Sequence, residues 1–295
     1  MIDHLERVIS QAGNFFGVAC TTTNLVNEAC RRHDVGPTAA TALGRALTGA
    51  VLLASLLKER QSVLLRFEGN GPLRKIITEA GATGWVRGYV AEPHAEVPLR
   101  AGRIDVASAL GHAGFLTVIK DIGSTHKYSG TIQLYSSEIG EDLAYYLLQS
   151  EQTPSTIALG IRLDREGTVA AAGGFLIQSL PPADEQLLQH LEQRIAALPP
   201  LSQWLLTGQG PADLLSHVFG DIPHRKTART PVYYQCTCNR DKMQRAVLTL
   251  PGEDLDDLRK KQEGLEVRCE FCRQSYLFSF QELTALLTPA SDRPQ

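Results

Sequence analysis

Four cysteines near the end of the chain are the residues best suited to chemistry. Cys236 and Cys238 are separated by one residue, Cys269 and Cys272 by two, and 30 residues lie between the two pairs. Close cysteine pairs spaced by a small domain's length of chain are typical of a metal site. We expect these four thiolates to hold one Zn²⁺ in a tetrahedral shell. Such a shell has no open position for water, which excludes a hydrolytic zinc centre.

The Cys-x-Cys spacing favours a redox role for this site. Cys-x-x-Cys is the commoner spacing in structural zinc sites, whereas two thiols one residue apart can close a strained and readily reduced ring. Clustered thiolates also react with oxidants. The alternative interpretation is a zinc ribbon with a purely structural role.

Loss of the metal is expected to unfold this part of the chain and so to act as a conformational switch. Zinc binding contributes about 10–16 kcal/mol to the folding of small metal domains, and whole domains hold only about 5–15 kcal/mol. Disulfides within each close pair would not replace the metal, because they close rings of a few residues. A tenfold difference in loop length corresponds to roughly 2 kcal/mol of chain entropy.

The cysteines lie in a small unit predicted over residues 231–295. The unit has few apolar residues, so its folded state is only marginally stable without a metal ion or another crosslink. A charged helix is expected over 253–261, and Ser279 with Glu282 forms a capping box for a terminal helix through Leu287. Strands are expected at 232–236, 265–269 and 275–278.

Residues 1–180 predict an α+β domain with a layered core. Residues 23–33 have helical spacing, and residues 38–58 are apolar on nearly every face, so this second helix must be covered on all sides. The strand-like runs follow in a block and do not alternate with helices. They are residues 63–68, 85–90, 115–120, 128–134, 156–163 and 169–177.

Residues 181–230 predict a helical linker region. Short amphipathic helices are expected around residues 187–198, 201–206 and 214–219, with Asp184 as the cap of the first. Helices this short gain most of their stability from packing, so they must dock on a neighbour. If their docking depends on the zinc unit, metal loss also exposes their apolar faces. The basic segment 223–231 is interpreted as a linker.

Composition and charge narrow the class of protein. The chain has 295 residues, 43% of them hydrophobic, and a net charge of −3, which excludes a disordered or strongly basic protein. No secretory signal is recognised at the start. Arg45 interrupts the apolar stretch 39–57, which argues against a membrane span. We therefore expect a soluble, intracellular protein, in which Cys20 and Cys30 are packed as small hydrophobic residues.

Several motifs resemble those of the redox-regulated 33-kDa heat-shock chaperones of bacteria. Residues 236–238, 266–272 and 276–283 closely resemble the family's signature, and residues 42–50 resemble its central helix. The resemblance extends over essentially the whole chain, in matching order. Further similar segments are residues 69–73, 88–90, 150–154 and 171–175.

The resemblance implies a cytoplasmic stress-response protein that binds unfolding client proteins without ATP and is not an enzyme. In that family the reduced, zinc-bound form is inactive. Oxidants, usually with heat or another unfolding stress, release zinc and form two disulfides, which correspond here to Cys236–Cys238 and Cys269–Cys272. The zinc domain and linker then loosen, and the active form is generally a homodimer. Neither nucleic acid nor membrane is expected as a partner.

Two other functions compete with this interpretation. A nucleic-acid-associated zinc ribbon would need a basic surface, yet residues 231–295 hold nine Lys and Arg against ten Asp and Glu. A thiol–disulfide oxidoreductase would place the first cysteine of Cys269-x-x-Cys272 at a helix N-terminus, whereas strand-like sequence flanks both cysteines here.

Overall fold

The computed structural model describes residues 2–123, 127–181, 184–250, 257, 260 and 264–287. Two compact units make up the chain, Met1–Gln235 and Cys236–Gln295, each with its own core. The helices of segment 181–230 belong to the first unit. The finer division at residues 180 and 230 stays a prediction.

The first sheet is antiparallel, with the strand order β10-β1-β2-β9-β8. β8 and β9 were predicted from their apolar runs, whereas β1 and β2 were missed. In β1 the pairing with β10 shifts between Arg7 and Val8, so the strand's apolar residues do not alternate regularly. The bounds are His4–Ser10 for β1, Phe15–Thr21 for β2, Ser155–Leu163 for β8, Val169–Ser179 for β9 and His224–Pro231 for β10.

The predicted linker over residues 223–231 was wrong, because these residues form strand β10. β10 pairs with β1 from Pro231 opposite His4 to His224 opposite Ser10. Its side chains are mostly exposed, so the strand carries no hydrophobic pattern that the sequence could reveal. Backbone hydrogen bonding to β1 determines this edge strand, and basic side chains are common at such edges.

The second sheet has the strand order β11-β5-β4-β3-β6-β7. Its neighbours pair antiparallel, except that the short β11 lies parallel to β5. The sequence predicted all of these strands except β4. The bounds are Ser62–Gly69 for β3, Lys75–Gly81 for β4, Trp85–Val90 for β5, Gly114–Asp121 for β6, Tyr128–Gln133 for β7 and Tyr233–Tyr234 for β11.

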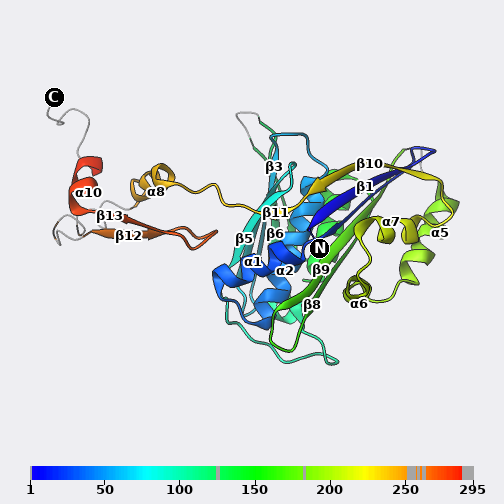
Figure 1. Ribbon diagram of the computed structural model, residues 1–295, viewed down its shortest axis with the longest axis horizontal. Coiled ribbons are helices and arrows are strands. Elements are labelled where there is room, and N and C mark those ends of the chain that lie inside the picture. Colours follow the sequence, from blue (N-terminus) through cyan, green and yellow to red (C-terminus); the bar gives the residue numbers. More distant parts are fainter. Residues whose placement is uncertain are drawn as a thin grey trace. The chain divides into compact units, whose positions relative to one another are not determined.

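Helix α2 (Pro37–Ala54) is the centre of the first unit and packs against strands of both sheets (Figure 1). Every residue of α2 except Pro37 and Arg45 is buried, which confirms the prediction of a helix covered on all sides. Gly49 lets helix α4 (Ile139–Glu151) approach closely, since a Cβ there would lie 2.4 Å from a methyl carbon of Leu143. The α+β class is confirmed. No helix among the described residues is both long and apolar enough to cross a membrane.

Three further helices complete the main core. α1 (Thr23–His33) was predicted with the observed bounds, and α3 spans Val106–Leu110. α4 (Ile139–Glu151) was not predicted. It buries Asp142, whose carboxylate accepts hydrogen bonds from the backbone N–H groups of Tyr135 and Ser136.

Short helices cover the outer face of the first sheet (Figure 1). They are α5 (Glu185–Ala196), α6 (Leu201–Trp204), the 3₁₀ turn η1 (Leu205–Thr207) and α7 (Pro211–Phe219). Asp184 caps α5 as predicted, by accepting the Leu187 N–H at 3.0 Å. These helices share a core of buried apolar side chains with β1, β2 and β9. Its members are Val8, Phe15, Ala19, Phe175, Ile177, Leu191, Leu214, Leu215, Val218, Phe219 and Ile222.

The second unit is small. It contains α8 (Arg240–Val247), the hairpin of β12 (Leu265–Arg268) and β13 (Ser275–Phe278), and α10 (Phe280–Leu287). The predicted capping box is present, since Ser279 and Glu282 exchange hydrogen bonds. The helix expected over 253–261 falls where the structure describes only residues 257 and 260. The cluster of buried apolar side chains is Val247, Phe278 and Leu283.

Candidate metal centre

Two separate segments of the second unit carry the four cysteines. Cys269 and Cys272 lie in the turn between β12 and β13, where the Cys269 N–H donates to the Gln274 carbonyl at 2.9 Å. Arg273 takes a left-handed conformation, with φ of 61°, and closes this turn. Cys236 and Cys238 lie on the extended segment that leads into α8. The hairpin and the start of α8 therefore position one pair each.

The four sulfur atoms lie within 4.8 Å of one another. The Sγ–Sγ distance is 3.8 Å between Cys236 and Cys269, and 3.3 Å between Cys238 and Cys272. A tetrahedral zinc shell with bonds of about 2.3 Å requires sulfur–sulfur distances of about 3.8 Å. The cluster therefore has the size of a zinc site. All four cysteines are free, so it contains no disulfide.

The electrostatics of the cluster also suit a cation. Cys269 and Cys272 are each 5% exposed. Contact with the Cys236 thiol and burial raise the pKa of Cys269, and burial raises the pKa of Cys272 to about 11. Thiolates this close are costly on their own, because like charges at short range repel. A soft divalent cation offsets that cost, so the four donors fit zinc.

Two neighbouring side chains contact the cysteine segments. The Tyr276 hydroxyl donates to the Sγ of Cys238 at 3.1 Å. The Lys242 ammonium donates to the Thr237 carbonyl at 2.7 Å and holds the Cys-x-Cys segment against α8. Sequence analysis did not assign Tyr276 this contact. The hairpin register brings its hydroxyl to the cluster, and the four-residue spacing from Cys272 alone does not reveal this.

The other candidate residues have different surroundings. Cys20 is 1% exposed in the main core, and Cys30 packs against the same core. Burial raises the pKa of both thiols, that of Cys30 to about 12, so neither has the character of a reactive thiol. These positions agree with the packing roles expected for the two cysteines.

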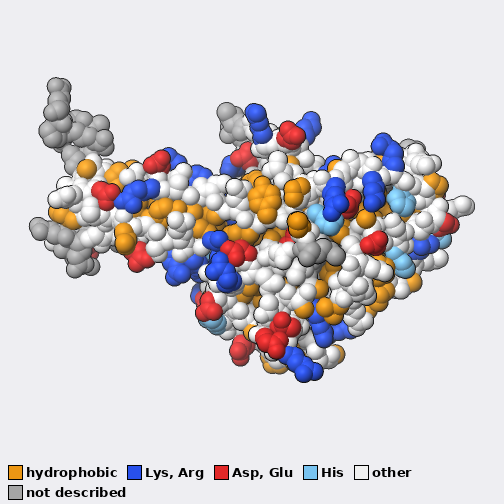
Figure 2. Space-filling view, in the orientation of Figure 1, with side chains coloured by type: hydrophobic (Ala, Val, Ile, Leu, Met, Phe, Trp, Pro, Cys, Tyr) orange, Lys and Arg blue, Asp and Glu red, His pale blue; other side chains and the backbone are white. Residues whose placement is uncertain are grey.

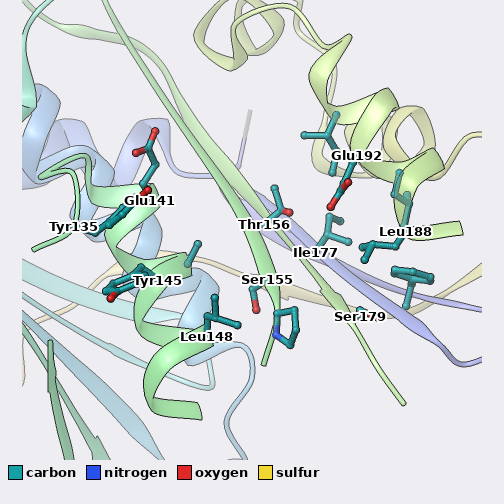
Figure 3. Close-up of a pocket in the computed structure, with 15 residues that line it drawn as sticks. Tyr135, Glu141, Tyr145, Leu148, Ser155, Thr156, Ile177, Ser179, Leu188 and Glu192 are labelled. Atoms are coloured by element: carbon teal, nitrogen blue, oxygen red, sulfur yellow. The ribbon is translucent and has the colours of Figure 1, made fainter. Parts of the chain in front are cut away.

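The first unit contains an apolar groove that the sequence did not reveal. Its volume is about 560 Å³, and it lies between α4, α5 and the neighbouring ends of β8 and β9. Figure 3 shows Tyr145 and Leu148 on one side, Leu188 on the other, and Ser155 between them. Tyr135 is 70% exposed and stacks on Tyr145 with a ring separation of 5.0 Å.

Comparison with known proteins agrees with the fold. The 33 kDa chaperonin of Desulfotalea psychrophila is 58% identical over 97% of this chain and 98% of its own length. That of Geobacter sulfurreducens is 49% identical, over 96% and 94%. The crystal structure of the 33 kDa chaperonin from Thermotoga maritima superposes with a TM-score of 0.90 at 35% identity, over 97% of this chain and 98% of that chain. The family model described as Hsp33 protein matches residues 3–279, and the chain therefore belongs to the Hsp33 family.

Proposed function

We propose that this protein is an ATP-independent holdase chaperone whose client binding is controlled by a zinc–thiolate redox switch. Membership of the Hsp33 family and the relatives named 33 kDa chaperonin support a chaperone function. The observation that carries the switch is the meeting of four thiols, from segments 30 residues apart, within 4.8 Å. Cys236, Cys238, Cys269 and Cys272 are the zinc ligands of this proposal.

In this proposal, zinc binding is the main stabilising interaction of the second unit. The described apolar core of that unit contains three buried side chains, those of Val247, Phe278 and Leu283. Complete burial of such side chains contributes about 1.5–3 kcal/mol each, whereas structural zinc contributes about 10–16 kcal/mol. Metal loss therefore removes the larger contribution and unfolds the unit.

Oxidation drives the metal out. Two molecules of peroxide oxidise four thiolates to two disulfides, Cys236–Cys238 and Cys269–Cys272, and each peroxide is reduced to two waters after taking up protons from solvent. Zn²⁺ leaves because disulfide sulfur is a poor ligand. Sulfur contacts of 3.8 and 3.3 Å join the two segments in the reduced form. Disulfides within each segment would leave the two segments unconnected, whereas disulfides across the segments would keep them joined.

The face of the first sheet that α5 and α7 cover is the client-binding surface of this proposal. Phe15, Phe175 and Ile177 are buried beneath α5 and α7. The apolar groove adjoins this cluster, since Phe15, Ile177 and Leu191 line both. Release of the helices would join the groove and the sheet face into one apolar surface, suited to unfolded chains.

The decisive experiment compares two states of the full-length protein. After zinc removal and peroxide oxidation it should suppress the aggregation of a heat-denatured test protein, and the reduced zinc form should not. Zinc stoichiometry and free thiols, measured before and after, should fall together by one metal and four thiols. Equal activity in both states would refute the switch.

Variants test the ligand assignment. Cys269→Ser should weaken zinc retention, because it removes one of four thiolate bonds. Cys30→Ser is the matched control, since this thiol packs against the main core. Unchanged metal content in Cys269→Ser would contradict the assignment.

The proposal includes a cytoplasmic location, a homodimeric active form and no enzymatic activity. The oxidoreductase alternative is disfavoured because Cys269 and Cys272 lie in a hairpin turn, both 5% exposed. An insulin-reduction assay without turnover would support this ranking. For the nucleic-acid-associated zinc ribbon, salt-dependent filter binding is the corresponding test.

A further inference from the structure

Arg45 is a charged residue inside an otherwise apolar buried helix, and the proposed switch gives it no role. Its guanidinium forms an ion pair with Glu138, but its Nε is buried and has no hydrogen-bond partner among the described residues. A buried donor without an acceptor is costly and calls for an explanation. Arg45 also lines a cavity of about 360 Å³ in the first unit.

This cavity is formed by four parts of the first unit. They are α2, the turn 99–104, strand β8 and the start of α6. β8 is the last strand of its sheet, so the cavity lies along a sheet edge. The turn is tightly fixed, because Arg100 and Arg103 exchange backbone hydrogen bonds of 2.9 and 3.0 Å. Ala101 has a φ of 49° there, a conformation that costs a non-glycine residue about 1 kcal/mol or more.

The cavity is strongly cationic. Arg45, Arg103 and Arg162 line it, and no Asp or Glu is among its lining residues. Within the described part of the chain, Arg103 and Arg162 form no ion pair, and Glu138 is the carboxylate that offsets Arg45. Three arginines from three different elements therefore line the cavity, and Glu138 is the carboxylate that pairs with one of them, Arg45. Figure 2 shows the opposite pattern over much of the visible surface, where Lys and Arg lie interspersed with Asp and Glu.

The lining identifies the class of ligand. Arginine side chains bind phosphate and carboxylate through paired N–H donors. Three arginines contributed by separate elements can contact more oxygen atoms than a single carboxylate has, which favours a ligand with several phosphate oxygens. Ser202 and Gln203 add side chains that make no hydrogen bond with other described residues. A volume of about 360 Å³ exceeds the needs of a single phosphate.

We propose that this cavity binds a small molecule with two or more linked phosphate groups, with Arg45, Arg103 and Arg162 as its cationic contacts. The phosphates can belong to free pyrophosphate or to a nucleotide. Binding engages the guanidinium groups of Arg103 and Arg162 and brings negative charge into the cavity that Arg45 also lines. This site is separate from the cysteine cluster and from the switch proposed above.

Isothermal titration of the full-length, reduced, zinc-loaded protein tests the site. The probes are pyrophosphate, ADP and adenosine, and zinc content is measured after each titration because phosphates can extract zinc. We expect saturable 1:1 binding of pyrophosphate or ADP with one zinc retained, and no binding of adenosine. Tighter binding of ADP than of pyrophosphate would identify a nucleotide as the ligand, and the reverse would identify free pyrophosphate.

Exposed arginines provide matched variants. Arg103→Gln and Arg162→Gln should each weaken binding by about 10-fold or more, since hydrogen bonds to charged groups contribute about 1.5–3 kcal/mol. Arg165→Gln changes the same charge on a nearby exposed residue that does not line the cavity, and should alter the Kd less than twofold. Absence of saturable binding at millimolar pyrophosphate and ADP would overturn the proposal. So would equal weakening by Arg165→Gln, or a preference for a glutamate-rich peptide.

Discussion

Chelation of zinc from the reduced protein should unfold the second unit and leave the first intact. The buried side chains of Val247, Phe278 and Leu283 contribute about 5–9 kcal/mol together at about 1.5–3 kcal/mol each. The metal contributes about 10–16 kcal/mol. Ordering the chain costs about 1–2 kcal/mol of conformational entropy per residue. A core this small therefore cannot keep the unit folded without the metal.

Amide hydrogen exchange measures this directly. A unit held by about 5 kcal/mol protects its amides roughly 10³–10⁴-fold, and that protection should disappear from β12 and β13 after chelation. The Cys269 N–H, which donates to the Gln274 carbonyl inside the hairpin turn, is the most informative single amide. Strands β3 and β6, in the core of the first unit, should retain their protection and serve as the internal control.

Persistent protection of β12 and β13 would refute the reasoning. In that case the unit would be stable without metal, and zinc loss could not be the step that unfolds it. Oxidising the chelated protein extends the test, because disulfides between neighbours should not restore protection. Restored protection would indicate disulfides across the two segments, which mass mapping of the cysteine pairs would identify.

Three further predictions concern single contacts. Tyr276→Phe removes the hydrogen bond to the Cys238 sulfur, and peroxide should then release zinc about 10-fold faster, whereas Tyr128→Phe should not change the rate. Phe219→Ala should cost about 3–5 kcal/mol of helix docking, so that a dye for apolar surfaces binds the zinc-loaded protein; unchanged dye binding would contradict a cover held by this ring. Pyrophosphate should slow activation by peroxide and heat in the wild type but not in Arg162→Gln, because residues of α6 line the proposed phosphate site.

Helices and strands with an apolar face could be predicted from the sequence. α1 and α2 follow from helical spacing and from an apolar run too long for a strand. α4 was missed although Ile139, Leu143 and Leu147 have helical spacing, because Gly140 and the acidic residues that follow suggest a loop. Asp142 is satisfied by backbone N–H groups of residues 135 and 136, a contact that exists only in the folded chain.

The candidate metal site was easier to predict than its surroundings. Spacing alone singled out four cysteines as ligands, and their sulfur atoms do gather within 4.8 Å. The contact of Tyr276 with Cys238 was not predicted, because strand register, which no local pattern encodes, brings its hydroxyl to the Cys238 sulfur. The apolar groove and the arginine-lined cavity were missed for the same reason, since each collects residues from distant segments.

The chain between α7 and the first cysteine explains how unfolding of the second unit can affect helices that belong to the first. β11 consists of Tyr233 and Tyr234 and pairs only with β5 among the described strands. β10 is attached to β1 with most of its side chains exposed, so it depends on backbone hydrogen bonds of about 1 kcal/mol each. Val232, between the two strands, is 4% exposed and is the buried apolar residue that anchors this segment to the main core. When the fold that follows Cys236 is lost, fraying can proceed from β11 through β10 to α7, whose buried Phe219 fills the space above Gly17. Loss of that ring would uncover the outer face of the first sheet.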